Sequence, residues 1–130
     1  MRGQGTFEVS MKGEPPFDMV DGVALSKATL EKTFSGTIVG TSTVHMLAAR
    51  TPVELSAGYV AIERIRCTID GREGSFALLH VGLMNRGERA LTVRIVPDSG
   101  TGGLATISGS MDIRIVDKKH HYEIDYELGV

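Results

Sequence analysis

The 130-residue sequence contains no tryptophan, one cysteine and only four prolines. The single cysteine, Cys67, excludes an internal disulfide, and its place between Ile65 and Ile69 predicts a small buried side chain. The sequence also lacks an HExxH segment, paired cysteines and a nucleophile elbow, and the neighbours His120 and His121 point to opposite faces of a strand. We therefore expect neither a metal nor a cofactor.

Long apolar runs and an excess of basic charge are also missing. No stretch approaches the roughly 20 apolar residues of a membrane helix, and residues 1–5 lead into alternating residues rather than into a signal peptide. The formal net charge is −2, with acids and bases interspersed, so no basic stripe is available for phosphates. We expect a cytoplasmic protein that binds neither membrane nor nucleic acid.

The sequence is rich in glycine and in the β-branched residues threonine, valine and isoleucine. Sixteen glycines and many β-branched residues predict a β-rich chain with tight turns, and 42% hydrophobic content suits one domain over residues 1–130. The predicted strands are 6–12, 25–34, 38–49, 58–69, 74–84, 90–96, 107–116 and 122–128. Short turns between them indicate an antiparallel meander, and the lack of a covering helix favours closure into an eight-stranded, up-and-down, all-β barrel.

Two connections are longer than turns. Residues 14–22 contain adjacent prolines, and we expect this stiff loop to fold across one mouth of the barrel. Residues 97–104 contain three glycines without the lysine or the strand-to-helix setting of a phosphate loop, which predicts a tight structural crossover.

The segment from Tyr59 to Gly82 predicts a hairpin around Asp70-Gly71. On its first strand the odd positions form the apolar face, and Glu63 lies among them. A loop of two residues places Glu63 opposite Leu78 with His80 on the diagonal, and a loop of four places Glu63 directly opposite His80. Either loop brings this acid and imidazole together, whereas an odd-numbered loop separates them.

Two interpretations of this pair remain open. In the structural one, Glu63 pairs with an arginine at the rim and His80 is a hydrogen-bonded core residue. In the functional one, the pair supplies a general base or acid inside an apolar cavity. Lys32 shares the inner side and is expected to extend its amine to water or to pair with Glu63, and Tyr126 is expected either in the same polar cluster or in the core.

Several motifs in this order resemble the bacterial domain-of-unknown-function family 3224. They are Gly5-Thr6-Phe7-Glu8-Val9, Lys32-Thr33-Phe34-Ser35-Gly36, Glu63-Arg64, Asp70-Gly71-Arg72, Gly74-Ser75-Phe76, His80, Gly100-Thr101-Gly102 with Leu104, and Tyr122 to Leu128. The resemblance spans nearly the whole chain. It implies a relative of allene oxide cyclase and dirigent proteins, an eight-stranded antiparallel barrel with a central cavity, and no established activity.

The resemblance does not transfer cyclase chemistry. No catalytic residue of the plant cyclases, which close an unsaturated fatty epoxide into a cyclopentenone, matches a position of this chain. Cys67 stands where relatives have glycine, and we expect this larger residue to narrow the cavity.

Three functions are compatible with these observations. The first is a barrel that binds an apolar small molecule, with Glu63 and His80 as polar anchors. Its other expected contacts are Lys32, Cys67, Phe76, Leu78 and Tyr126. The second is an isomerase or cyclase that transfers protons through Glu63 or His80, and the third is a structural or assembly protein with a filled barrel. A homo-oligomer is compatible with all three.

Overall fold

A computed structural model describes residues 1–129, and within this range the chain forms ten strands and no helix. The strands are β1 (Arg2–Gly13), β2 (Asp18–Val20), β3 (Val23–Gly36), β4 (Val39–Arg50), β5 (Ala57–Ile69), β6 (Arg72–Asn85), β7 (Glu88–Ile95), β8 (Thr101–Gly102), β9 (Ser108–Val116) and β10 (Lys119–Glu127). In the described range, therefore, no helix is long and apolar enough to cross a membrane.

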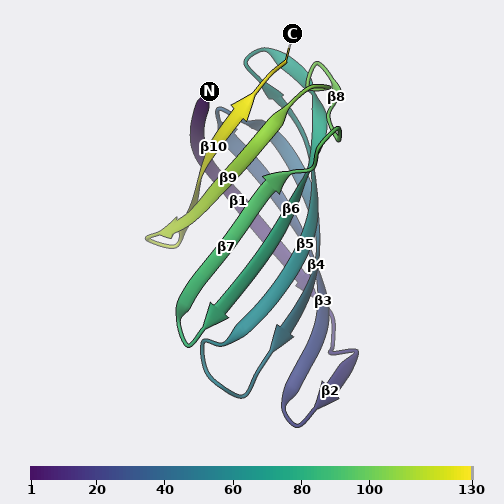
Figure 1. The fold of residues 1–130 in the computed structure, drawn as a ribbon, viewed down its shortest axis with the longest axis vertical. Helices are drawn as coiled ribbons and strands as arrows, with labels where there is room; N and C mark the ends of the chain where they lie inside the picture. Colours follow the sequence, from purple (N-terminus) through teal and green to yellow (C-terminus); the bar gives the residue numbers. More distant parts are fainter. Residues whose placement is uncertain (130) are drawn as a thin grey trace.

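The long strands close into an antiparallel barrel (Figure 1). Their order is β1-β10-β9-β7-β6-β5-β4-β3, and β3 pairs back onto β1. The predicted all-β, eight-stranded barrel is confirmed, with β2 and β8 as two short additional strands. The largest shift in a predicted boundary is at β1, which begins at Arg2 rather than at residue 6.

The turn between β5 and β6 contains two residues. Asp70 and Gly71 have φ angles of 51° and 74°, as a type I′ turn requires at both central positions. Glu63 consequently pairs with Leu78, and His80 pairs with Ala61 on the diagonal from Glu63. This is the two-residue alternative of the predicted hairpin, and it places Glu63 and His80 on the inner face.

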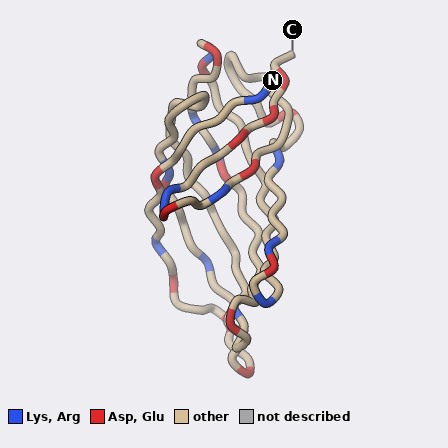
Figure 2. The backbone as a smooth tube through the Cα atoms, turned by 90° about the vertical axis from the view of Figure 1, so that its left-hand side faces the viewer, with Lys and Arg blue, Asp and Glu red and all other residues tan. Residues whose placement is uncertain are grey.

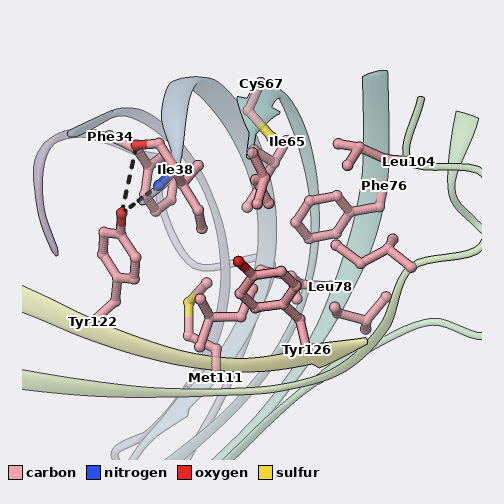
Figure 3. Packing of buried hydrophobic residues seen from close by; sticks show 14 of the residues in the cluster. Phe34, Ile38, Ile65, Cys67, Phe76, Leu78, Leu104, Met111, Tyr122 and Tyr126 are labelled. Atoms are coloured by element: carbon pink, nitrogen blue, oxygen red, sulfur yellow. Dashed lines mark hydrogen bonds between the residues drawn. The ribbon is translucent and has the colours of Figure 1, made fainter. Parts of the chain in front are cut away.

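One half of the barrel is filled by side chains (Figure 3). The buried cluster is apolar and draws on nearly every long strand, with Ile65, Phe76, Leu78 and Ile124 at most 1% exposed. The phenol of Tyr122 enters it from β10, accepts a hydrogen bond from the Ile38 amide at 2.9 Å and donates one to the Ser35 carbonyl at 2.8 Å. This phenol therefore ties β10 to the turn between β3 and β4.

The crossover between β7 and β9 covers the mouth of the filled half. Leu104 and Ile107 insert into the buried cluster, and β8 pairs with the start of β6. The loop of residues 14–22 does not fold across the other mouth as expected. It stays beside β3 instead, because its backbone bonds to Leu25 and Lys27 and its short strand β2 continue the ladder begun by β1.

The barrel has one weak seam, between β7 and β9. In the described part of the chain only Val93 and Arg94 pair with Met111 and Ser110 there, whereas every other pair of neighbouring barrel strands shares six or more positions. Beyond this short ladder the two strands diverge towards the uncovered mouth (Figure 1).

We expect Leu104 to hold the crossover onto the filled half. Leu104→Ala should lower the free energy of unfolding by about 2–5 kcal/mol, because it leaves a void among fully buried side chains. Leu79→Ala is the matched control, since Leu79 is 42% exposed on the outer wall, and it should cost about 1 kcal/mol or less. Urea unfolding followed by circular dichroism measures both, and equal losses would contradict the anchoring role.

Candidate functional site

The other half of the barrel contains a cavity of about 550 Å³ that opens to solvent. Its wall is built from residues of β1, β3, β4, β5, β6, β7, β9 and β10, the last of which contributes His120. Most of these side chains are apolar, among them Val9, Leu30, Val44, Met46, Leu91 and Ile113. The cavity therefore offers a largely apolar surface, with one group of polar residues where it meets the filled half and two arginines, Arg50 and Arg89, at its open end.

Glu63 lies at this boundary and is fully buried. Its Oε1 accepts hydrogen bonds from His80 Nε2 at 2.7 Å and Lys32 Nζ at 3.2 Å, and its Oε2 accepts one from Ser42 Oγ at 2.6 Å. Four strands thus supply one polar cluster, since these residues come from β5, β6, β3 and β4. We call Lys32, Ser42, Glu63 and His80 the floor cluster.

The floor cluster holds Glu63 in its ionised form. Burial is the largest influence and by itself would raise the pKa of this carboxyl group. The hydrogen bond from His80, the charge of Lys32 and the hydrogen bond from Ser42 together outweigh burial, so the pKa of Glu63 lies below its ordinary value of 4.5. An ionised carboxylate only accepts hydrogen bonds, so Nε2 of His80 carries the proton that it shares with Glu63.

His80 and Lys32 line the cavity, whereas Glu63 lies behind them. Within residues 1–129 no buried side-chain nitrogen or oxygen lacks a hydrogen-bond partner, and the bond of His80 is made by Nε2. Its Nδ1 is therefore the ring nitrogen that reaches the cavity. The Lys32 ammonium also lies 4.5 Å from the ring centre of Phe7, which lines the same space.

The charge partner of Glu63 differs from one expectation. The structural interpretation paired Glu63 with an arginine at the rim, but its partner is Lys32, one of the two placements expected for that lysine. Arg64 and Arg66 cannot reach Glu63 from the interior, because they occupy the alternate, outward positions of β5.

The other expected contacts lie in the filled half. Phe76, Leu78 and Cys67 belong to the buried cluster and are not part of the cavity wall (Figure 3). Cys67 pairs with Gly40 of β4, and its side chain belongs to the core instead of narrowing the cavity as expected. Burial raises the pKa of its thiol to about 11. Tyr126 donates a hydrogen bond to Asp70 at 2.6 Å, away from the floor cluster.

Ser42, Tyr59, Arg50 and Arg89 are site residues that the sequence reasoning did not identify. Ser42 had a recognisable signal, because it is a polar residue at an even position in the middle of a strand, where the neighbouring even positions Val44, Met46 and Ala48 are apolar. Tyr59 lies on the same face of the hairpin as Glu63. The two arginines lie at strand ends near turns and carry no comparable pattern.

Within the described residues no group of three or more histidine, cysteine or acidic side chains is arranged to hold a metal ion. The imidazole, ammonium, hydroxyl and carboxylate groups of the floor cluster can form hydrogen bonds and transfer protons. A cavity-facing imidazole with a carboxylate behind it has the arrangement in which a carboxylate orients a histidine and fixes its tautomer.

Comparisons with known proteins agree with the fold. The model of a family described as protein of unknown function (DUF3224) matches residues 3–126. A solved structure of a protein with unknown function from the DUF3224 family of Shewanella oneidensis MR-1 is 39% identical, with a TM-score of 0.95 over 100% of this chain and 98% of the other. No curated protein matches the chain significantly.

Replacing the buried carboxylate tests the electrostatics of the floor cluster. Glu63→Gln should cost about 3–5 kcal/mol at neutral pH, because it leaves the buried Lys32 without its charge partner. The pKa of Glu63 is lowered in the folded state, so its stabilisation is present above pH 4.5 and is lost as the pH falls through the lowered value. The difference between wild type and variant should therefore shrink in acid.

Urea unfolding at a series of pH values measures this difference. Glu31→Gln removes the same charge from the outer wall, where Glu31 is exposed and bonds to Thr43, and it should change stability little at any pH. A Glu63→Gln deficit that stays constant from neutral to acid pH would contradict the ionised, paired carboxylate.

Proposed function

The chain belongs to the DUF3224 family, whose description assigns no function, and from the cavity itself we propose that this barrel binds an apolar small molecule. The observation that supports the proposal most directly is a solvent-connected cavity of about 550 Å³ whose apolar wall ends at cavity-facing groups of His80 and Lys32. Ligand sites are typically clefts of roughly 300–1,000 Å³ with apolar walls and few polar groups.

The barrel has one half filled by side chains and one half that contains a cavity, and this difference supports binding over a purely structural role. Eight-stranded barrels are readily filled by their own side chains, and here one half is filled in this way. The other half combines small inward residues, such as Ala48, Ala61 and Gly82, with a hydrogen-bonded polar floor. Larger side chains at Ala48 and Ala61 would fill this space, so the small residues that line it keep it open.

The floor cluster also supports a second candidate, an enzyme that moves a proton on the bound molecule. Nδ1 of His80 faces the cavity, while Nε2 donates to the ionised Glu63 at 2.7 Å. A carboxylate behind an imidazole stabilises the imidazolium that forms when Nδ1 accepts a proton. The same geometry orients a ligand without reaction, so binding is the proposal and proton transfer is its extension.

Filling the cavity tests binding. Ala61 is 4% exposed, lies beside His80 in the register and lines the cavity. Ala61→Leu should abolish the fluorescence gain of the neutral dye Nile red and the thermal stabilisation that it produces, because the added methyl groups occupy the ligand space. Ala105→Leu makes the same change in the exposed crossover and should leave both signals unchanged.

Native mass spectrometry of freshly purified protein extends this test to natural ligands and to the oligomeric state. A co-purified small molecule on wild type that is absent from Ala61→Leu supports the proposal. Equal Nile red binding by wild type and Ala61→Leu, with both folded by circular dichroism, would overturn it.

Proton transfer needs a different measurement. The extension predicts that a molecule recovered from the barrel exchanges hydrogen for deuterium when returned to wild type in D₂O. His80→Gln should slow this exchange at least about 100-fold, the usual range for loss of a general base, while binding persists. Equal exchange rates for wild type and variant would remove His80 from any such role.

A further inference from the structure

The charged residues that line the cavity are all basic. Within residues 1–129 its lining residues include Lys32, Arg50 and Arg89 and no aspartate or glutamate. The chain as a whole is slightly acidic, and Figure 2 shows acidic and basic residues interspersed along the backbone. The excess of basic residues is thus a property of the cavity and not of the whole molecule.

The two ends of the cavity differ in their balance of charge. At the floor, Lys32 is 3.2 Å from Glu63, so the two charges largely cancel for a group inside the cavity. Neither Arg50 nor Arg89 forms an ion pair within residues 1–129. The uncompensated positive charge therefore lies with these two arginines.

Strand register places both arginines at the uncovered mouth. Arg50 is the last residue of β4 and Arg89 is near the start of β7. They are joined by one transverse row of paired residues, in which Arg50 pairs with Ala57, Ala57 with Met84, and Met84 with Arg89. Paired residues share a face, and the whole row lines the cavity, so both side chains start from the inner side of the rim.

Tyr59 adds a hydroxyl group to this region. Its ring lies over Gly82, where a Cβ atom would be 2.3 Å from Cε1, so only glycine leaves room for it. Burial, the largest influence, raises the pKa of the Tyr59 phenol despite the opposing charge of Arg89. The phenol is therefore a protonated hydrogen-bond donor, and it shares the cavity wall with Arg89.

We propose that the molecule held in this barrel is an anionic amphiphile. Its acidic head group lies at the mouth against Arg50 and Arg89, and the Tyr59 hydroxyl is a further hydrogen-bond donor on the same part of the wall. Its apolar body extends inward along the aliphatic wall to the floor cluster. This inference rests on the proposed binding function and adds to it the charge and the orientation of the ligand.

The physical reason is that each end of the cavity suits one end of such a molecule. An anion at the mouth stays partly hydrated and meets two free guanidinium groups, which form charge-assisted hydrogen bonds with carboxylates and related anions. An anion at the floor would lose its water and would face the buried carboxylate of Glu63 behind His80 and Lys32. The apolar body gains in turn by leaving water for the aliphatic wall.

Three probes with the same ten-carbon chain isolate the head group: decanoate, decanol and decyltrimethylammonium. At neutral pH and low salt, isothermal titration should show wild type binding decanoate about tenfold more tightly than decanol, with the cation weakest. Added salt should reduce the preference for decanoate and leave decanol unchanged, because exposed charges are screened.

The double variant Arg50→Gln/Arg89→Gln should bind decanoate and decanol with nearly equal affinity. Arg66→Gln is the matched control, since Arg66 is an exposed arginine on the outer face of β5 and should leave the preference intact. A double variant that keeps the wild-type preference, or a wild type that binds decanol as tightly as decanoate, would overturn the inference and leave the proposed binding function standing. Failure of all three probes and of Nile red would overturn both.

Discussion

This barrel is organised around one fully buried carboxylate, which needs charge partners and hydrogen-bond donors to stay ionised. An ionised group removed from water costs several kcal/mol unless charges and hydrogen-bond donors replace its hydration. Glu63 receives that replacement from Lys32, Ser42 and His80, which lie on three further strands. Their mutual geometry therefore requires β3, β4, β5 and β6 to pair in one register, and the cluster separates the filled half of the barrel from the cavity.

The two halves differ because different residues occupy equivalent inward positions. In the filled half, Phe76, Ile65 and Tyr122 occupy the interior, and the crossover adds Leu104 from above. Towards the other mouth, the inward residues of β5 and β6 include Ala57, Ala61 and Gly82, and the seam between β7 and β9 narrows to two paired positions. The result is a barrel closed at one end. The charges of Lys32 and Glu63 balance at the floor of its cavity, and Arg50 and Arg89 leave positive charge at its open rim.

Much of the fold could be predicted from the sequence because strand signals are local. Burial alternates along β5 because apolar residues recur at every second position. The turn at Asp70-Gly71 forms because these two residue types tolerate positive φ angles. The same patterning predicted that Glu63 and His80 would lie together. The path of residues 14–22 was not predictable in this way, because prolines stiffen a segment without stating which neighbour it follows, and here backbone bonds to β3 decide its path.

By itself the sequence determined the eight long strands, their antiparallel meander and a hairpin at Asp70-Gly71 in which a loop of two or of four residues sets the acid beside the imidazole. The structure decided for the loop of two residues. Only the tertiary structure decided which residues meet across distant strands. Lys32 and Ser42 complete the floor, Tyr126 turns to Asp70, and Arg50 and Arg89 share one rim. The physical reason is that local patterning assigns a residue to a face, whereas closure of the barrel and the register of non-adjacent strands assign it a depth and a partner.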